Sequence, residues 1–161
     1  RPWFALFFLL SRFLRPRLLM GCSLRFSLGI QFITAAVPAI EQRWPGTHAF
    51  GFGHLGDGNV HFHVLAPVGA IRGVWEEAEG KGVSARVYDL VTAWGGSISA
   101  EHGIGQMKVD ELARLHDPVA LALMAQVKAA LDPGNLLNPG KLLLSPPERE
   151  AARLARTAAK A

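Results

Sequence analysis

The amino-acid sequence predicts an α+β fold, in which an antiparallel sheet is covered by helices. Residues 30–44, 82–94 and 118–131 repeat apolar residues at steps of three and four, which is the period of an amphipathic helix. Residues 59–65 alternate between polar and apolar side chains, which is typical of a strand with one buried face. The 161 residues, half of them hydrophobic, are enough for one domain with its own core.

The first predicted helix begins near residue 30 and ends before the turn at Trp44-Pro45-Gly46. Pro38 removes one intrahelical hydrogen bond, so we expect the helix to kink or to split near Val37. The face expected to be buried carries Ile30, Ile33, Val37, Ile40 and Trp44.

The other two predicted helices have clear end signals. Gly95 and Gly96 end the helix over residues 82–94, since glycine favours the left-handed cap, and Asp117 before Pro118 is a good N-cap for the helix over residues 118–131. The expected buried positions are Val83, Val87, Leu90, Val91 and Trp94 in the former and Val119, Leu123, Met124, Val127 and Leu131 in the latter.

Three short strands are expected, over residues 47–52, 59–65 and 97–100. In the second, Val60, Phe62 and Val64 should face the core. The opposite face, which is either open to solvent or turned toward a ligand, carries Asn59, His61, His63 and Leu65.

Charge and composition exclude some classes of partner. The net charge of +4 comes from the two ends, where residues 1–25 carry five arginines and no acid, so the middle of the chain is mildly acidic. A nucleic-acid-binding face is therefore not expected. The apolar run over residues 3–10 is too short to span a bilayer, so no integral membrane span is expected. Cys22 is the single cysteine, which fits a reducing compartment, and we expect a cytoplasmic protein.

Two polar clusters bounded by glycines carry the chemistry. Residues 53–61 hold His54 and His61 around the flexible Gly56-Asp57-Gly58, and residues 99–105 hold Glu101 and His102. If the clusters meet, His54, His61 and Glu101 form a three-ligand metal site with open positions, as in catalytic centres. Such ligands suit zinc, manganese, cobalt or iron, with no choice among them from the sequence.

Plainer interpretations stay open for each residue. His54 could cap its loop, His61 could lie on a solvated strand face, and Asp57 is most simply a turn residue. His63 is either an additional ligand or a solvated strand residue, and Asn59 could orient a histidine or contact substrate.

Three long motifs then resemble one known family, the C-terminal domain of FAD-linked oxidases in the vanillyl-alcohol oxidase superfamily. The similarity is greatest to the branch of D-lactate, D-2-hydroxyglutarate and glycolate dehydrogenases. It covers roughly residues 30–143 and rests on the order and spacing of GHLGDGNVH (residues 53–61), GSISAEHGIG (residues 96–105) and LDPGNLLNPGK (residues 131–141).

The resemblance implies a ferredoxin-like α+β domain and the oxidation of a D-2-hydroxy acid to the 2-oxo acid. His54, His61 and Glu101 would hold a divalent metal, with zinc or manganese favoured, and His102 would be the base. Asn138 would lie near the ring of FAD, and Asn59 and His63 are candidate substrate contacts. The implied partners are a small 2-hydroxy acid and an FAD-binding domain or subunit, because this chain shows no sequence of such a domain.

The resemblance also divides the chain. Residues 1–28 do not match the family, so the sheet is expected to be incomplete at its N-terminal side; residues 29–145 form the domain, and residues 146–161 form an exposed tail. Position 63 is often asparagine in the hydroxyglutarate branch, so His63 leaves the substrate open. Two other hypotheses remain, an inactive remnant or binding module and a metal-dependent hydrolase that acts alone.

Overall fold

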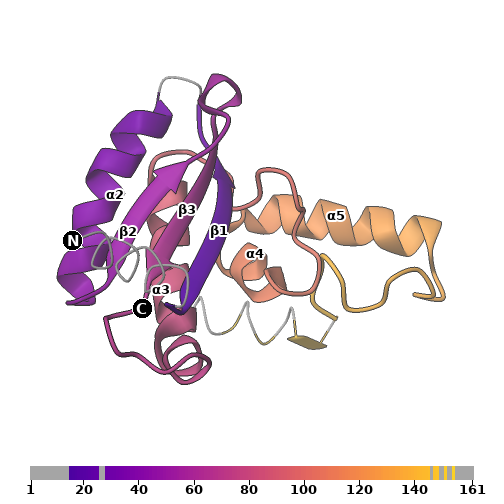
Figure 1. Cartoon of the computed structure of the whole chain (residues 1–161). Helices are drawn as coiled ribbons and strands as arrows, with labels where there is room; N and C mark the ends of the chain where they lie inside the picture. Colours follow the sequence, from indigo (N-terminus) through magenta and orange to yellow (C-terminus); the bar gives the residue numbers. More distant parts are fainter. Residues whose placement is uncertain (1–14, 26–27, 146, 149–150, 152–153, 155–161) are drawn as a thin grey trace, which may run out of the picture. The chain divides into compact units, whose positions relative to one another are not determined.

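The computed structural model describes residues 15–25, 28–145, 147–148, 151 and 154 (Figure 1). The chain divides into two compact units, Arg1–Glu101 and His102–Ala161, and each is described by itself. The expected apolar run over residues 3–10 and most of the expected tail lie outside the described residues.

The first unit is built on a three-stranded antiparallel sheet with the strand order β1-β3-β2. Strands β1 (Arg17–Ser23) and β2 (His48–Phe52) flank β3 (Asn59–Leu65), which is therefore central. The element order β1-α2-β2-β3-α3 is that of the first five elements of a ferredoxin-like βαββαβ unit. The α+β prediction is confirmed.

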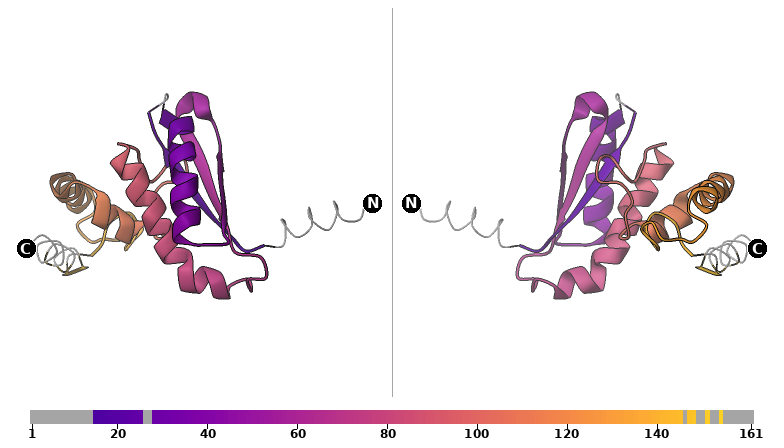
Figure 2. Two further views of the ribbon diagram at one scale, coloured as in Figure 1. Left: turned by 90° about the vertical axis from the view of Figure 1, so that its left-hand side faces the viewer. Right: turned by 90° about the vertical axis from the view of Figure 1, so that its right-hand side faces the viewer.

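Helices α2 (Gly29–Arg43) and α3 (Val74–Ala93) pack on one face of this sheet (Figure 2). The predicted core residues of β3 are all buried, and the ring of Phe62 meets Phe32 of α2 edge-on at 5.9 Å between centroids. Burying such side chains stabilises the unit by roughly 1.5–3 kcal/mol each. The shared core also includes Met20, Cys22, Ala36, Ile40, Val83, Val87 and Val91.

The buried face of helix α2 matches the predicted one only in part, since Ile40 is buried as predicted and Ile33 lies against Gly51 of β2. Phe32, Ala36 and Ile40 point to the sheet, whereas Ile30 is 65% exposed. Apolar residues occupy more than one stripe of this helix, and the larger Phe32 ring takes the place against Phe62. Pro38 lies inside one continuous helix, so the predicted split near Val37 is wrong.

Helix α3 starts eight residues before the predicted start and carries the predicted buried positions Val83, Val87 and Val91. Its first turns lack an apolar stripe but are anchored by the Glu76 carboxylate, which accepts a hydrogen bond of 2.7 Å from the Gly73 N–H. Gly95 has φ of 71°, as expected for the left-handed residue after the helix.

The free edge of β1 carries a remnant of the strand predicted over residues 97–100. That strand is reduced to one bridge between Ser97 and Ser23. Residues 17–23 fall in the segment that does not match the family, yet they form β1, and all seven residues are in register with β3.

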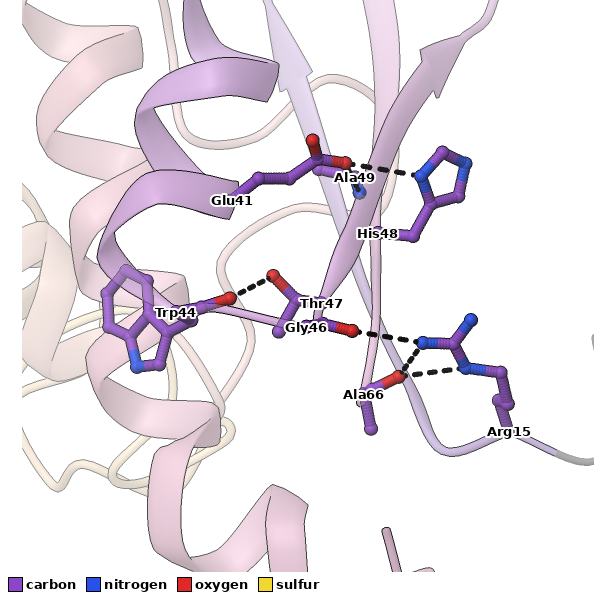
Figure 3. A network of polar contacts seen from close by, with 8 residues as sticks. All are labelled: Arg15, Glu41, Trp44, Gly46, Thr47, His48, Ala49 and Ala66. Carbon is purple, nitrogen blue, oxygen red and sulfur yellow. Dashed lines mark hydrogen bonds and ion pairs between the residues drawn. The ribbon is translucent and has the colours of Figure 1, made fainter. Parts of the chain in front are cut away.

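Polar contacts fix the ends of β2 and β3 (Figure 3). The Glu41 carboxylate at the end of α2 accepts a hydrogen bond of 2.8 Å from the Ala49 N–H and lies 3.2 Å from His48 Nδ1. The Arg15 guanidinium donates to the carbonyls of Gly46 and Ala66, where β2 begins and β3 ends. These contacts tie the helix and both strand ends together.

The second unit contains α4 (Val109–Leu115) and α5 (Pro118–Leu131). Asp117 caps α5 as predicted, since its carboxylate accepts from the N–H groups of Val119 and Ala120 at 2.8 and 3.0 Å. The predicted burial of the α5 stripe is wrong, because no residue of α5 is buried. The seven-residue α4 is too short to cover this fourteen-residue helix.

An apolar groove of about 610 Å³ lies between α5 and the segment over residues 132–145.

None of the helices in the described part of the chain combines the length and the apolar composition that a membrane-spanning helix needs.

Candidate functional site

The glycine-rich loop between β2 and β3 folds around the carbonyl of His54. This oxygen accepts the N–H groups of Asp57 at 2.9 Å and Asn59 at 3.2 Å, which closes a short 3₁₀ turn over Leu55–Asp57. Asp57 is exposed in this turn, in agreement with a turn residue. This turn therefore holds His54 next to Asn59, the first residue of β3.

Gly53 makes this loop possible. Its φ of 152° lies in a region that is essentially restricted to glycine, and a Cβ at this position would lie 2.3 Å from the carbonyl oxygen of Asn59. The backbone at position 53 can therefore pass this close to the Asn59 carbonyl, between the end of β2 and the start of β3, only when residue 53 is glycine.

Glu101 approaches His54 and Asn59 from the β1 edge of the sheet. Ser97 and Ser23 exchange two backbone hydrogen bonds of 2.7 and 2.9 Å, and Ser23 lies opposite Asn59 in the sheet register. Ser97, Ser23 and Asn59 thus form one row across the sheet, and the chain continues from Ser97 to Glu101 beside that row.

The two clusters meet through His54, Glu101 and Asn59. His54 Nδ1 lies 3.1 Å from Glu101 Oε1, and the Asn59 amide donates to the same oxygen at 3.3 Å. The side chains of His54 and Glu101 are 64% and 36% exposed, so the pair is open to a ligand. An exposed pair of this kind stabilises the fold little, typically by less than about 1 kcal/mol.

His61 lies next to this pair. Its ring is half-buried and perpendicular to the ring of His54, with 6.1 Å between centroids. Two donors on one metal ion are roughly 3.0–3.5 Å apart when the bonds are about 2.1 Å, and two such imidazole rings are roughly 4.5–5.5 Å apart. His54 and Glu101 meet this condition, whereas His61 is about 1 Å too distant. Accordingly, no three His, Cys, Asp or Glu side chains among the described residues form a metal-binding group.

His63 is buried, which corrects the expectation of a solvated strand residue. It is 7% exposed, and its ring stacks on Phe50 and Phe52 with 5.0 Å between centroids in each case. Neither ring nitrogen of His63 has a hydrogen-bond partner among the described residues. Burial lowers the pKa of His63, and the charges of Arg17 and His61 lower it further.

Two predicted residues fall in the second unit. His102 is exposed and follows Glu101 directly in the chain. Asn138 lines the apolar groove beside α5 and adopts φ of 48°, a left-handed conformation that asparagine tolerates better than most residues.

The sequence did not point to Phe50, Phe52 and Gly21, which surround the histidines. Phe52 and Gly21 both lie opposite His61, and the Phe52 ring is 5.7 Å from the His61 ring. A Cβ on Gly21 would meet nothing nearer than His61 Nδ1 at 4.0 Å, so the space beside His61 is open. The alternation of Phe50 and Phe52 in β2 could have indicated this face, but its register with β3 could not be read from the sequence.

Known proteins that resemble this chain carry related names. This chain is 38% identical over 105 residues to D-2-hydroxyglutarate dehydrogenase of Stutzerimonas stutzeri, and the alignment covers 64% of this chain and 22% of that protein. It is 43% identical over 98 residues to the mitochondrial D-2-hydroxyglutarate dehydrogenase of Bos taurus, covering 60% and 16%. It is 42% identical over 125 residues to D-lactate dehydrogenase of Archaeoglobus fulgidus, covering 71% and 27%.

The chain therefore spans about a quarter or less of the length of these relatives. The family model for the C-terminal domain of FAD linked oxidases matches residues 30–142, which include all three motifs and the candidate site. The chain belongs to the family of FAD linked oxidases and carries their C-terminal domain.

Proposed function

We propose that this chain is the substrate- and metal-binding part of an FAD-dependent enzyme that oxidises a D-2-hydroxy acid to the 2-oxo acid. The observation that supports the proposal best is the pairing of His54 with Glu101, 47 residues apart in sequence and 3.1 Å apart in space. The names of the relatives, D-2-hydroxyglutarate and D-lactate dehydrogenase, support the same class of substrate.

His54, His61 and Glu101 are the residues that would hold a divalent metal, with zinc or manganese favoured. Their donors fit in part: the separation between His54 and Glu101 suits two ligands of one ion, whereas the His61 ring lies 6.1 Å from the His54 ring between centroids, farther apart than two imidazoles on one ion. A bound metal would polarise the hydroxyl group of the substrate and lower its pKa. The Asn59 amide restrains Glu101 by donating to its carboxylate, the kind of supporting contact that orients metal ligands.

His102 is the proposed base for the hydroxyl proton. Its exposed imidazole is adjacent in sequence to Glu101, and a neutral imidazole is the usual acceptor in such a step. Asn138 is proposed to lie beside the flavin, and its carboxamide can both donate and accept hydrogen bonds there. FAD, when bound to the domain that accompanies this one, supplies the acceptor for the hydride.

Metal binding is the first test. The purified chain should take up about one equivalent of Zn²⁺ or Mn²⁺ in calorimetric titration, and His54→Ala and Glu101→Gln should each weaken the affinity by about 100-fold or more. His116→Ala is the matched control, because His116 is an exposed histidine in the second unit. Equal affinities for the His54 and His116 variants, or no uptake by the natural chain, would contradict the proposed ligands.

Flavin reduction is the second test. The chain should be co-expressed with the FAD-binding domain of a relative and mixed with D-lactate, glycolate and D-2-hydroxyglutarate without another acceptor. Bleaching of the flavin absorbance, lost in His102→Ala, is the expected result. A reconstituted flavoprotein that all three acids leave oxidised would count against this substrate class.

A further inference from the structure

Within the second unit, two neighbouring hydrogen bonds join the end of the GSISAEHGIG motif to the end of the LDPGNLLNPGK motif. The Leu142 N–H donates a hydrogen bond of 2.8 Å to the carbonyl of Gly105. The Lys141 ammonium donates to the side-chain oxygen of Gln106, which is 35 positions away in sequence. A charged donor makes this second bond stronger than one between neutral groups. We call the two hydrogen bonds the motif clamp.

The backbone is strained where the clamp is made. Leu142 has φ of 67°, in the left-handed region that residues with a Cβ rarely adopt. Its N–H meets the Gly105 carbonyl in this conformation. A left-handed leucine persists only where the surrounding contacts hold it, so its presence is a second sign that the clamp fixes this segment.

One end of the clamp restrains the loop that carries His102. Gly103 and Gly105 in this loop have φ of 68° and 57°, and glycines give a loop little stiffness of its own. The exposed imidazole of His102 is three positions before Gly105. The hydrogen bonds at Gly105 and Gln106 therefore limit how far this imidazole can move relative to the rest of the unit.

The other end of the clamp restrains the turn that carries Asn138. The Asn138 carbonyl accepts a hydrogen bond of 3.2 Å from the Lys141 N–H. On the other side of Asn138, the buried carboxylate of Asp132 accepts one of 2.9 Å from the Leu137 N–H. Asn138 is thus held from both sides, and the clamp connects its turn to the loop of His102.

We propose that Gln106 and Lys141 are positioning residues, which fix the separation between the base His102 and the flavin-side residue Asn138. This inference rests on the proposed function, because only that function gives His102 and Asn138 their roles. Gln106 and Lys141 themselves touch neither substrate nor flavin.

The proposed reaction depends on this separation. The hydroxyl proton of the substrate goes to His102, the hydride on C2 goes to the flavin, and the bond between C2 and oxygen becomes double. Both transfers start from one substrate molecule, so the base and the flavin-side turn must be placed correctly at the same time. A displacement of about 1 Å can slow such a step by about 100-fold.

Amide exchange and NMR of the full chain test the clamp without flavin or substrate. Lys141→Met removes the donor at nearly constant size, and it should speed exchange of the Leu142 amide by about tenfold and shift the ring signals of His102. Lys141→Arg keeps a donor and should preserve both. Gln106→Ala should have the effects of Lys141→Met, and Gln126→Ala, at an exposed glutamine of α5, is the matched control that should change neither.

Combining the two substitutions tests whether the two side chains act together. Gln106→Ala and Lys141→Met remove the two partners of one contact, so the double variant should exchange the Leu142 amide no faster than either single variant.

Flavin reduction in the reconstituted enzyme tests the effect on the reaction. Gln106→Ala and Lys141→Met should each lower the rate of flavin reduction at saturating substrate by about tenfold, and Lys141→Arg should retain most of the natural rate. KM should change little, because the clamp does not touch the substrate. The midpoint of urea unfolding should also change little, because the contact between these two side chains is exposed.

The outcomes separate the two proposals. Unchanged Leu142 exchange and His102 signals in Lys141→Met, additive effects in the double variant, or an equal loss of rate in Lys141→Arg would overturn the clamp inference alone. Flavin reduction that is as fast in Gln106→Ala and Lys141→Met as in the natural chain would also overturn it alone. A natural reconstituted enzyme whose flavin none of the three acids reduces would overturn the proposed function and the inference that rests on it.

Discussion

Replacing Gly53 by alanine should damage the first unit, whereas the same replacement at Gly56, three residues later, should not. Both glycines lie in the loop that carries His54, and both changes add one methyl group. The two positions differ in backbone conformation and in the space around the new Cβ. Gly56→Ala is therefore a matched control for Gly53→Ala.

The expected magnitude follows from two contributions at Gly53. An L-residue at φ of 152° costs about 1–3 kcal/mol, and a Cβ placed 2.3 Å from the Asn59 carbonyl oxygen forces the ends of β2 and β3 apart. Together they should lower the free energy of unfolding by about 2–4 kcal/mol. At Gly56 no atom lies within 4 Å of the new Cβ and φ is not positive, so alanine should be neutral or should stabilise by up to about 1 kcal/mol.

Amide hydrogen exchange of the β3 residues, followed by NMR, reports on the first unit separately from the second. A urea titration followed by circular dichroism gives the accompanying change in the midpoint of unfolding. Gly53→Ala should also weaken Zn²⁺ or Mn²⁺ binding, because its displaced loop carries His54. If the two alanine variants showed equal protection in β3, the close approach at Gly53 would not be a determinant of this fold.

Three other substitutions test the core and the second unit. Phe62→Ala removes a fully buried ring and should cost about 3–5 kcal/mol in urea unfolding, and a loss below about 1 kcal/mol would contradict its central place in the core. Asp117→Ala removes the N-cap of α5 and should cost about 1 kcal/mol, seen as faster amide exchange in its first turn; unchanged exchange would show that the cap is not needed. Asp132→Asn should loosen the turn after α5. The Lys128 ammonium and the N–H groups of Leu136 and Leu137 lower the pKa of Asp132 to about 2, so its stabilising contribution is complete above the ordinary carboxyl pKa of 3.8 and is lost as the pH falls through about 2. Protection of those two amides should fall over this pH range in the natural chain and should be weak at all pH values in Asp132→Asn.

Local signals in the sequence were sufficient for most of the secondary structure. The alternation over residues 59–65 gave the buried face of β3, and Asp117, Pro118 and Gly95 marked helix ends that the structure contains. These features depend on neighbouring residues along the chain, so a single sequence carries them. The meeting of His54 with Glu101 was expected from the chemistry of two clusters, while their catalytic roles stay predictions.

Other features depend on partners distant in sequence and could not be predicted. The α2 face was predicted only in part: Ile40 is buried as expected, but Ile30 and Phe32 lie on competing apolar stripes, and the choice between them depends on the fit of Phe32 to Phe62. The α5 stripe was expected to be buried because its period is helical, but period alone does not supply a covering surface. The strand predicted over residues 97–100 is one bridge to Ser23, and its partner β1 is distant in sequence, so the extent of the pairing could not be predicted.

The environment of His63 shows how strand register determines chemistry on this sheet face. Side chains alternate between the two faces of a strand, so His61 and His63 lie on the same face of β3, and the sequence alone predicts the same environment for both. Register separates them: His61 has Gly21 on one side and remains half-open, whereas His63 has Leu19 on one side and Phe50 on the other and is buried. A shift of β1 by two residues would place Leu19 instead of Gly21 opposite His61 and would close the space beside His61. The pairing of β1 with β3 therefore decides which of the two histidines stays partly exposed and which is buried.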